Sequence, residues 1–387
     1  MPGYITSIGT AKPVYSFPQG SIADFMSKSA GLDQDERRRL QVLYRASGIK
    51  SRSSVIPDFG RPFGEYEFFP NAPFLKPEPN VSQRLQLFRK YGPELAAEAI
   101  ISCLENHSNK DLSDITHLIT VSCTGMYAPG LDIDIIRRLE MSTSTKRTNI
   151  AFMGCYAAFN GLNVAGSICQ ADPEAVVLVV CVELCTIHYR TGKDTDTLLA
   201  NALFGDGAAA ALIQGHSDGQ NALQMTSSYS EMLSEGIEEM TWEISPLSFE
   251  MKLSSYVPDL IKKGIGKLTA ILLNKGSVRL SDIAYFAIHP GGKRILEVLE
   301  EELEMETSDN RFAYKVLREY GNMSSATIVY VLKELLNELI PGDQGKNVLS
   351  LAFGPGLTIE SMLLKTVLAE PSVTTTQKTY AAIQGKI

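Results

Sequence analysis

The 387-residue chain lacks the features that mark several large classes of protein. Its longest apolar run, residues 175–182, is far shorter than the ~20 residues that cross a bilayer, and it predicts a buried parallel strand. The first residues contain neither a basic stretch nor an apolar core, so we expect no signal peptide and no membrane partner. A net charge of −8 argues against nucleic acid as a partner, because nucleic-acid-binding proteins present basic surfaces.

Cysteine is scarce and irregularly spaced. No two of the six cysteines have the Cys-x-x-Cys spacing of a metal site, and together they form no disulfide framework. We therefore expect reduced thiols, a cytoplasmic location and no bound metal. Five of the six fit the usual fate of a free cysteine, which is burial in an apolar core. The exception is Cys155.

Three polar residues are expected where strands give way to helices. Cys155 follows a short strand and begins a helix over 156–169, and a thiol at a helix N-terminus is favoured as thiolate. His289 ends an apolar run and precedes Pro-Gly-Gly, where the missing side chains let a ligand approach the backbone. Asn322 begins a helix over 326–339. An inert cysteine and a structural histidine are the plain alternatives for the first two.

A faint internal repeat links these positions. Residues 114–121 match residues 282–289, and 154–157 match 321–324 at nearly the same offset. The repeat predicts two similar α/β halves, 1–225 and 226–387, each with buried strands alternating with helices. Cys155 and Asn322 occupy equivalent helix starts, so facing halves would bring the thiol and the amide into one pocket.

Other segments carry simpler expectations. Pro93 fits the first turn of a helix over 94–106. Residues 55–82, rich in Pro and Phe, predict a wrapped loop, and 377–387 predict a loosely held tail.

Five motifs in order resemble those of the type III polyketide synthases, the chalcone-synthase-like branch of the thiolase superfamily. They are ITSIGTA, LFGDGAA, HPGG, GNMSSA and AFGPG, at residues 5–11, 203–209, 289–292, 321–326 and 352–356. The resemblance implies a five-layered αβαβα thiolase-like fold, a homodimer, an acyl-CoA starter and malonyl-CoA as substrates, and no cofactor. The implied reaction is iterative decarboxylative condensation followed by cyclisation to an alkylpyrone or a resorcinol- or phloroglucinol-type product.

The resemblance also assigns roles. It implies that Cys155 carries the acyl chain, that His289 pairs with its thiolate as imidazolium, and that His289 and Asn322 stabilise the enolate from malonyl-CoA. The implied pocket residues are Phe204, Met251, Trp242, Cys123, Thr124, Ala128, Cys185, His188, Phe353, Gly354 and Pro355. The implied CoA-binding residues are Arg39, Arg45, Lys50, Gly291, Gly292 and Ser324. A solvated helix face explains the basic stretch around Arg39 equally well.

Departures from the plant enzymes concern the starter. Trp242 stands where they have glycine, which predicts a shallow cavity floor. Small residues at Thr124, Ala128 and Cys185 resemble bacterial alkylpyrone and alkylresorcinol synthases, where such positions border a tunnel for a fatty acyl chain. Tyr189 would shorten that tunnel, and a compact cavity for short starters is the alternative.

Two related classes of enzyme remain open. A β-ketoacyl-ACP synthase III also uses Cys, His and Asn, but it performs a single condensation and needs a basic surface for a carrier protein. A hydroxymethylglutaryl-CoA synthase uses a glutamate base near its cysteine.

Overall fold

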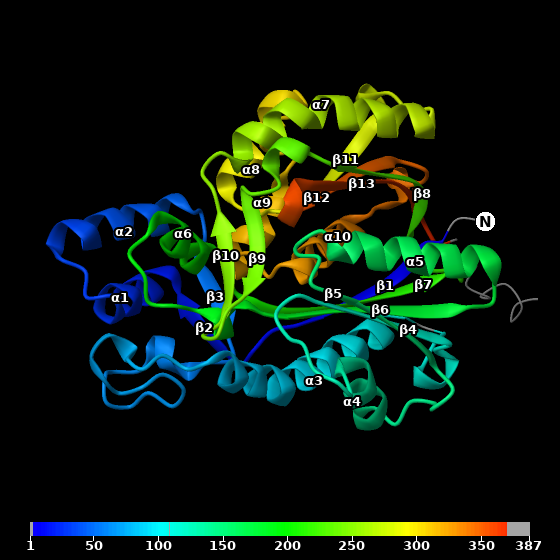
Figure 1. Ribbon diagram of the computed structural model, residues 1–387. Coiled ribbons are helices and arrows are strands. Elements are labelled where there is room, and N and C mark those ends of the chain that lie inside the picture. The colour runs from blue at the N-terminus through cyan, green and yellow to red at the C-terminus, as the bar shows by residue number, and fades with distance from the viewer. Residues whose placement is uncertain (1–2, 108, 370–387) are drawn as a thin grey trace, which may run out of the picture.

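The computed structural model describes residues 3–107 and 109–369, and its helices and strands alternate in five layers (Figure 1). Helix α3 (Val81–Glu105) covers the outer face of one part of the sheet. Helices α5 (Ala157–Ala171) and α10 (Ser325–Glu338) form the middle layer, and α7 (Val257–Gly276) with α8 (Lys293–Glu302) covers the other outer face. This is the αβαβα arrangement that the resemblance implied.

The nine-stranded sheet consists of two arms with the same pairing pattern. The order is β11-β12-β13-β8-β1-β7-β6-β4-β5. From β1 to β4, and again from β8 to β11, the neighbours pair antiparallel, antiparallel and parallel. This supports two related halves, although the proposed boundary at 225 falls inside β8. The bounds are β1 Tyr4–Ala11, β4 His117–Ser122, β5 Lys146–Ala151, β6 Val176–Leu184, β7 Asp206–Gln214, β8 Ala222–Met232, β11 Ile283–Ile288, β12 Asn347–Gly354 and β13 Thr358–Val367.

The middle layer is close-packed because α5 carries small residues. A Cβ added to Gly161 would lie 2.9 Å from the Val179 side chain and 3.2 Å from that of Val121, so only glycine fits there. Val179 belongs to β6, which is buried along its whole length. The apolar run at 175–182 therefore forms the predicted buried strand, which is parallel to β4 and antiparallel to β7.

The expectation for Pro93 was wrong. Helix α3 begins twelve residues earlier, at Val81, and Pro93 lies inside it. The start is fixed by Asn80, whose side chain accepts a hydrogen bond from the Gln83 backbone while the Gln83 side chain bonds back to the Asn80 backbone. Packing of α3 against β1, β6 and β7 stabilises the helix despite the missing proline N–H.

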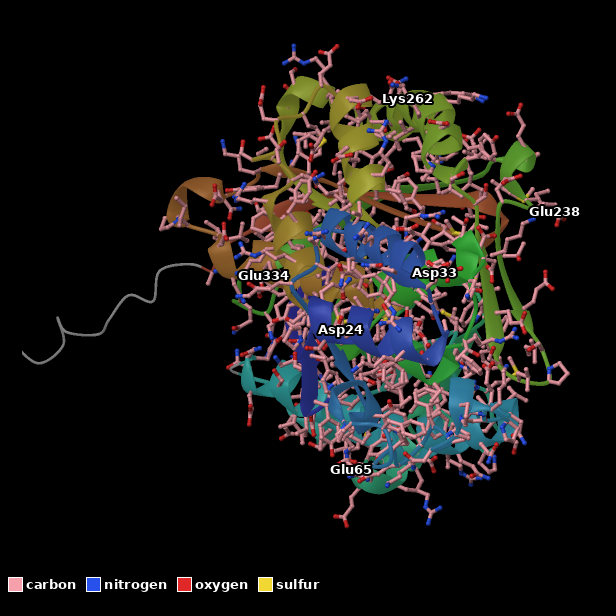
Figure 2. All side chains as sticks on the ribbon, turned by 90° about the vertical axis from the view of Figure 1, so that its left-hand side faces the viewer. Asp24, Asp33, Glu65, Glu238, Lys262 and Glu334 are labelled. Carbon is pink, nitrogen blue, oxygen red and sulfur yellow. The ribbon has the colours of Figure 1, made fainter. Side chains whose placement is uncertain are left out.

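Smaller elements frame the remaining side of the molecule. Figure 2 looks onto α1 (Gln19–Ser29) and α2 (Gln34–Ala46), with Asp24 and Asp33 labelled there. The hairpin of β9 (Met240–Ile244) and β10 (Phe249–Leu253) packs against α6 (Thr195–Leu203). The others are β2 (Tyr15–Pro18), β3 (Ser51–Ser54), α4 (Leu131–Arg138) and α9 (Arg311–Tyr320).

Two expectations concern the less regular segments. Residues 55–80 form loops with two short 3₁₀ turns, and the last two residues of the predicted loop, 81 and 82, already belong to α3. The tail at 377–387 lies outside the described residues. No helix in the described part of the chain is long and apolar enough to cross a membrane.

The packing of β1 on α3 gives a test of the fold. A Cβ at Gly9 would lie 2.1 Å from the Cys103 backbone nitrogen and 2.2 Å from the Ala99 oxygen, so Gly9→Ala must push α3 away. We expect the free energy of unfolding to fall by about 1–3 kcal/mol or more, measured by denaturant titration. Gly20→Ala, in α1 with nothing within 4 Å of the added Cβ, is the matched control and should be neutral or slightly stabilising. Equal losses in both variants would contradict the tight β1–α3 contact.

Candidate active site

The fold brings Cys155 and Asn322 together. Cys155 lies between β5 and α5 and is 6% exposed, and Asn322 lies just before α10 and is 2% exposed. The Cys155 sulfur is 4.0 Å from both Oδ1 and Nδ2 of Asn322. The thiol and the amide thus share one pocket, as the sequence repeat led us to expect.

The amide of Asn322 is fixed by the backbone around it. Its Nδ2 donates to the Gly291 carbonyl oxygen at 3.2 Å, and its Oδ1 accepts from the Ser324 N–H at 2.8 Å. The second amide N–H is left to the Cys155 sulfur, in a long contact of 4.0 Å that a ligand oxygen can replace. Gly291 lies two residues after His289, which continues β11, so the amide is tied to the turn that carries the histidine.

His289 is buried without a partner. It is 1% exposed, and neither ring nitrogen has a hydrogen-bond partner among the described residues. Burial lowers the pKa of His289 to about 3 and raises the pKa of the Cys155 thiol to about 12. Burial thus opposes the thiolate–imidazolium pair expected from the sequence. Such a pair can form only if its mutual attraction and the polar groups near the sulfur outweigh the lost hydration.

Cys155 opens into a cavity of about 440 Å³. The wall contains most of the predicted pocket residues, which are Phe204, Met251, Trp242, Cys123, Thr124, Cys185 and His188. Ser324, predicted for CoA, also lies on this wall, and its hydroxyl is 3.1 Å from the Cys123 sulfur. It is too deep for a surface phosphate site, because Ser324 is 4% exposed. Sequence reasoning missed Ile22, Met26, Phe59 and Arg52 on the same wall.

Two groups of predicted pocket residues lie elsewhere. Ala128 is exposed in a loop and does not line the cavity of this chain, so a path beside it stays a prediction. The loop of Phe353, Gly354 and Pro355 buttresses the nucleophile from behind and is absent from the cavity wall. A Cβ at Gly354 would lie 3.2 Å from the Cys155 backbone nitrogen, and a Cβ at Gly154 would lie 2.2 Å from the Pro355 ring.

The predicted CoA-binding residues separate into two places. Arg39, Arg45 and Lys50 are exposed on α2 and the loop after it, and none of them lines the cavity. Gly291 and Gly292 follow His289, in the turn that the Asn322 amide contacts. The two places are linked by Lys293, whose side chain packs beside Gly48.

His188 holds one wall of the cavity. Its Nδ1 accepts from the Phe249 N–H at 3.1 Å, so its Nε2 donates to the Thr124 carbonyl oxygen at 2.7 Å. Burial lowers the pKa of His188 to about 3, so the ring is neutral. The ring stacks on Phe249 at 4.3 Å between centroids, and the indole N–H of Trp242 donates to the Cys123 carbonyl oxygen at 2.7 Å. His188 therefore joins the β9–β10 hairpin to the cavity wall.

Glu183 was overlooked in the sequence because it lies within an apolar strand. Its carboxyl group is fully buried and accepts hydrogen bonds from the backbone and side chain of Cys123 and from the Ser122, Thr124 and Ser325 hydroxyls. Burial raises the pKa of Glu183, and these hydrogen bonds oppose that rise. Both oxygens are occupied, and Glu183 does not line the cavity, so it is not placed as a base for a bound substrate.

The described residues contain no group of three or more His, Cys, Asp or Glu that could hold a metal ion. All six cysteines are buried and unpaired. The site thus presents a thiol, an imidazole and an amide beside a cavity whose wall contains both apolar and polar side chains. That set suits acyl transfer through a thioester.

Comparisons with known proteins agree with this chemistry. Residues 2–217 match the family profile described as chalcone and stilbene synthases, N-terminal domain, and residues 224–368 match the C-terminal domain. The chain is 29% identical over 364 residues to the alpha-pyrone synthesis polyketide synthase-like Pks18 of Mycobacterium tuberculosis, covering 93% of this chain and 90% of that one. It is 29% identical over 373 residues to 3,5-dihydroxyphenylacetyl-CoA synthase of Streptomyces toyocaensis, covering 93% and 89%.

A solved structure gives the same result. The crystal structure of PKS-I from the brown alga Ectocarpus siliculosus superimposes with a TM-score of 0.87 at 29% identity, over 95% of this chain and 98% of that chain. This chain therefore belongs to the chalcone and stilbene synthase family. It is an acyltransferase of the type III polyketide synthase class, with the thiolase-like fold, and neither a carrier-protein-dependent synthase III nor a hydroxymethylglutaryl-CoA synthase.

The unpartnered imidazole gives a test of the site. If His289 becomes the imidazolium partner of the Cys155 thiolate, it lowers the pKa of a thiol that burial alone raises. Wild type should then react with iodoacetamide at lower pH than His289→Gln, in which the alkylation rate should still climb about tenfold per pH unit at high pH. Mass spectrometry of the Cys155 peptide from about pH 5 to about pH 10 measures both profiles. Coincident profiles would exclude the ion pair.

Proposed function

We propose that the chain condenses malonyl-CoA repeatedly onto an acyl-CoA starter held as a thioester on Cys155. The Cys155 sulfur attacks the starter carbonyl and free CoA leaves, while His289 takes up the thiol proton. Malonyl-CoA then loses CO₂, and the electron pair of the broken bond becomes an enolate. The enolate carbon attacks the Cys155 thioester and releases the sulfur. No metal or further cofactor takes part in this scheme.

The observation that carries this proposal is the position of a buried thiol beside two possible hydrogen-bond donors. The Asn322 Nδ2 donates to the Cys155 sulfur in a long contact of 4.0 Å, and neither ring nitrogen of His289 has a hydrogen-bond partner among the described residues. Preorganised donors in a site that excludes water are the main means of stabilising an oxyanion. Phe204, on the same wall, supplies an apolar neighbour for the departing carboxylate.

Separate assays of acylation and decarboxylation test the roles. Asn322 serves only the enolate, so Asn322→Ala should lower malonyl-CoA decarboxylation by about 10²–10³-fold and change Cys155 acylation by less than about threefold. His289→Ala should impair both steps, and Cys155→Ala should abolish acylation. Acyl-enzyme formation is read by mass spectrometry and decarboxylation by the release of CO₂. Equal loss of acylation in the Asn322 and His289 variants would contradict the division of labour.

The starter is a separate proposal, and the cavity favours a long alkyl chain. The cavity wall includes Ile22 and Met26 of α1, Phe59 and Tyr189. Tyr189 is fixed by a 2.5 Å hydrogen bond between its hydroxyl and that of Ser29, and by edge contacts with Phe59 and Phe69. These side chains offer an apolar arm for a fatty acyl tail, with an alkylpyrone or resorcinol-type product. A shallow cavity for short starters is the alternative.

A larger side chain in this apolar arm should block long starters while the proposed catalytic residues stay unchanged. Each buried methylene contributes about 0.8 kcal/mol, so Met26→Trp should lower turnover of long acyl-CoA by more than about tenfold relative to acetyl-CoA. Ala128→Phe is the matched control, because Ala128 lies outside the cavity of this chain. Steady-state kinetics with acyl-CoA substrates of increasing chain length measure this change in turnover. A chain-length effect in Ala128→Phe alone would favour a tunnel completed by a second copy, and no effect in either would favour the shallow cavity.

CoA is proposed to bind where basic residues of α2, α8 and α9 meet. The Lys50 N–H donates to the Arg318 carbonyl oxygen at 2.7 Å, and the Lys293 side chain lies 3.5 Å from the Cβ position of Gly48. Arg45 and Lys50 extend this basic area, and Gly291 with Gly292 leaves room for the pantetheine arm. Arg39 is exposed on α2, and nothing among the described residues favours a CoA contact over a solvated side chain there.

We further propose a homodimer in the cytoplasm. Strand β5 is the outer edge of the nine-stranded sheet, and four consecutive residues from Lys146 are exposed. An exposed edge strand is a ready template for pairing with a second copy. Reduced, unpaired cysteines and free CoA substrates suit the cytoplasm. Sedimentation velocity measures the oligomeric state directly.

A further inference from the structure

Arg52 is a buried cation at the meeting point of three segments. It lies on β3 and is 3% exposed. Its Nε donates to Gln19 Oε1 at 2.9 Å, and its Nη1 donates to the carbonyl oxygen of Phe204. Gln19 in turn donates to the Ala202 carbonyl oxygen at 2.8 Å. The guanidinium is therefore tied to the chain on both sides of Leu203.

The segment that Arg52 holds is paired with the catalytic segment. The Asn322 N–H donates to the Leu203 carbonyl oxygen, and the Gly205 N–H donates to the Asn322 carbonyl oxygen, both at 2.9 Å. These two hydrogen bonds flank Phe204 and form a parallel bridge between residues 204 and 322. The backbone of Asn322 is thus fixed by a segment that Arg52 fixes.

The stem of Arg52 also packs between two glycines. A Cβ at Gly321 would lie 2.9 Å from the Arg52 Cγ and Cδ, and a Cβ at Gly205 would lie 3.4 Å from its Cβ. Gly321 has φ +71°, a conformation that other residues rarely adopt. The side chain therefore fills the space beside the bridge while its guanidinium bonds the carbonyl in the middle of it.

We infer that Arg52 is a positioning residue that sets the Asn322 amide for decarboxylation by clamping the Phe204–Asn322 bridge. This inference rests on the proposed role of Asn322 as a donor to the enolate. Arg52 acts through the backbone of residue 322, whose amide stands 4.0 Å from the Cys155 sulfur. A small shift of that backbone displaces the amide N–H from the developing oxyanion, whereas in the proposed scheme Cys155 and His289 carry out acylation.

The test separates the two half-reactions. Arg52→Met should lower the kcat of malonyl-CoA decarboxylation by about tenfold or more, because displacement of a donor by an ångström is costly, and should change Cys155 acylation by less than about threefold. Arg52→Lys keeps the positive charge but loses the planar guanidinium with its several fixed donors. Its decarboxylation rate should therefore lie between those of Arg52→Met and wild type. Equal losses in both half-reactions would overturn the inference.

A double-mutant cycle distinguishes positioning from general damage. If Arg52 acts through the amide, then Arg52→Met should cause no further loss of decarboxylation in an Asn322→Ala background. A further loss of the same size would overturn the inference. If Asn322→Ala alone leaves decarboxylation intact, the proposed function of Asn322 fails first, and that result is distinct from a failure of Arg52.

Two more variants test whether the effect of Arg52→Met comes from misfolding. Arg84 is an equally buried arginine whose guanidinium bonds the carbonyl oxygens of Ile187 and Tyr189, away from the bridge. Arg84→Met should lower stability without changing the ratio of decarboxylation to acylation. Gln19→Met removes the partner of Nε together with the Gln19 hydrogen bonds to Ala202 and Ser47, and it should reproduce the selective loss in weaker form if Arg52→Met does not fold. An unchanged ratio in Gln19→Met, or an altered one in Arg84→Met, would count against Arg52.

Discussion

The active site depends on the close packing of α5 and α10 between the two arms of the sheet. Within the sheet, the described strands of the two arms pair where β1 meets β8, through Tyr4 with Gln224 and Ile5 with Leu223. So small a connection cannot fix the distance between a thiol in one half and an amide in the other. The middle layer does so, because α5 contacts β4, β6, β7 and β13, while α10 contacts β1, β6, β7 and β11. Glycine and alanine on α5 allow this close approach.

The first residues of α5 and α10 are buried between the two arms of the sheet. An unpaired polar group there costs free energy, because it loses its hydrogen bonds to water. His188 and His289 show the two outcomes in similar surroundings. Burial lowers the pKa of each to about 3, but His188 has a backbone partner at both nitrogens and His289 has none. Glu183 resembles His188 in having hydrogen-bond partners, since its carboxyl group accepts hydrogen bonds from several neighbours. Of these three buried residues, His289 alone has polar side-chain atoms without a hydrogen-bond partner among the described residues, and it is the one that the reaction would use.

Sequence reasoning recovered what local motifs determine. The helix starts at Cys155 and Asn322, the strand before His289 and the fold class follow from short segments and from one repeat. The Arg52 clamp was missed because its partners, Gln19 and Phe204, are 33 and 152 positions away. Ile22 and Met26 were missed for a related reason, because their pattern in α1 is that of an ordinary amphipathic helix. Ala128 was assigned by resemblance alone, and its exposure depends on how its loop folds, which the sequence does not show.

The cavity is bounded by two kinds of wall, and this bears on specificity. On one side the hairpin is pinned by backbone hydrogen bonds from His188 and Trp242, so the shape there is set by the fold. Ile22 and Met26 of α1 also line the cavity, and the unbranched side chain of Met26 adapts to a ligand at little cost. A starter chain on the adaptable side and a growing polyketide against the rigid side is the arrangement that such walls favour. Variation in α1 can then alter the starter while the cyclisation surface and the three proposed catalytic residues stay in place.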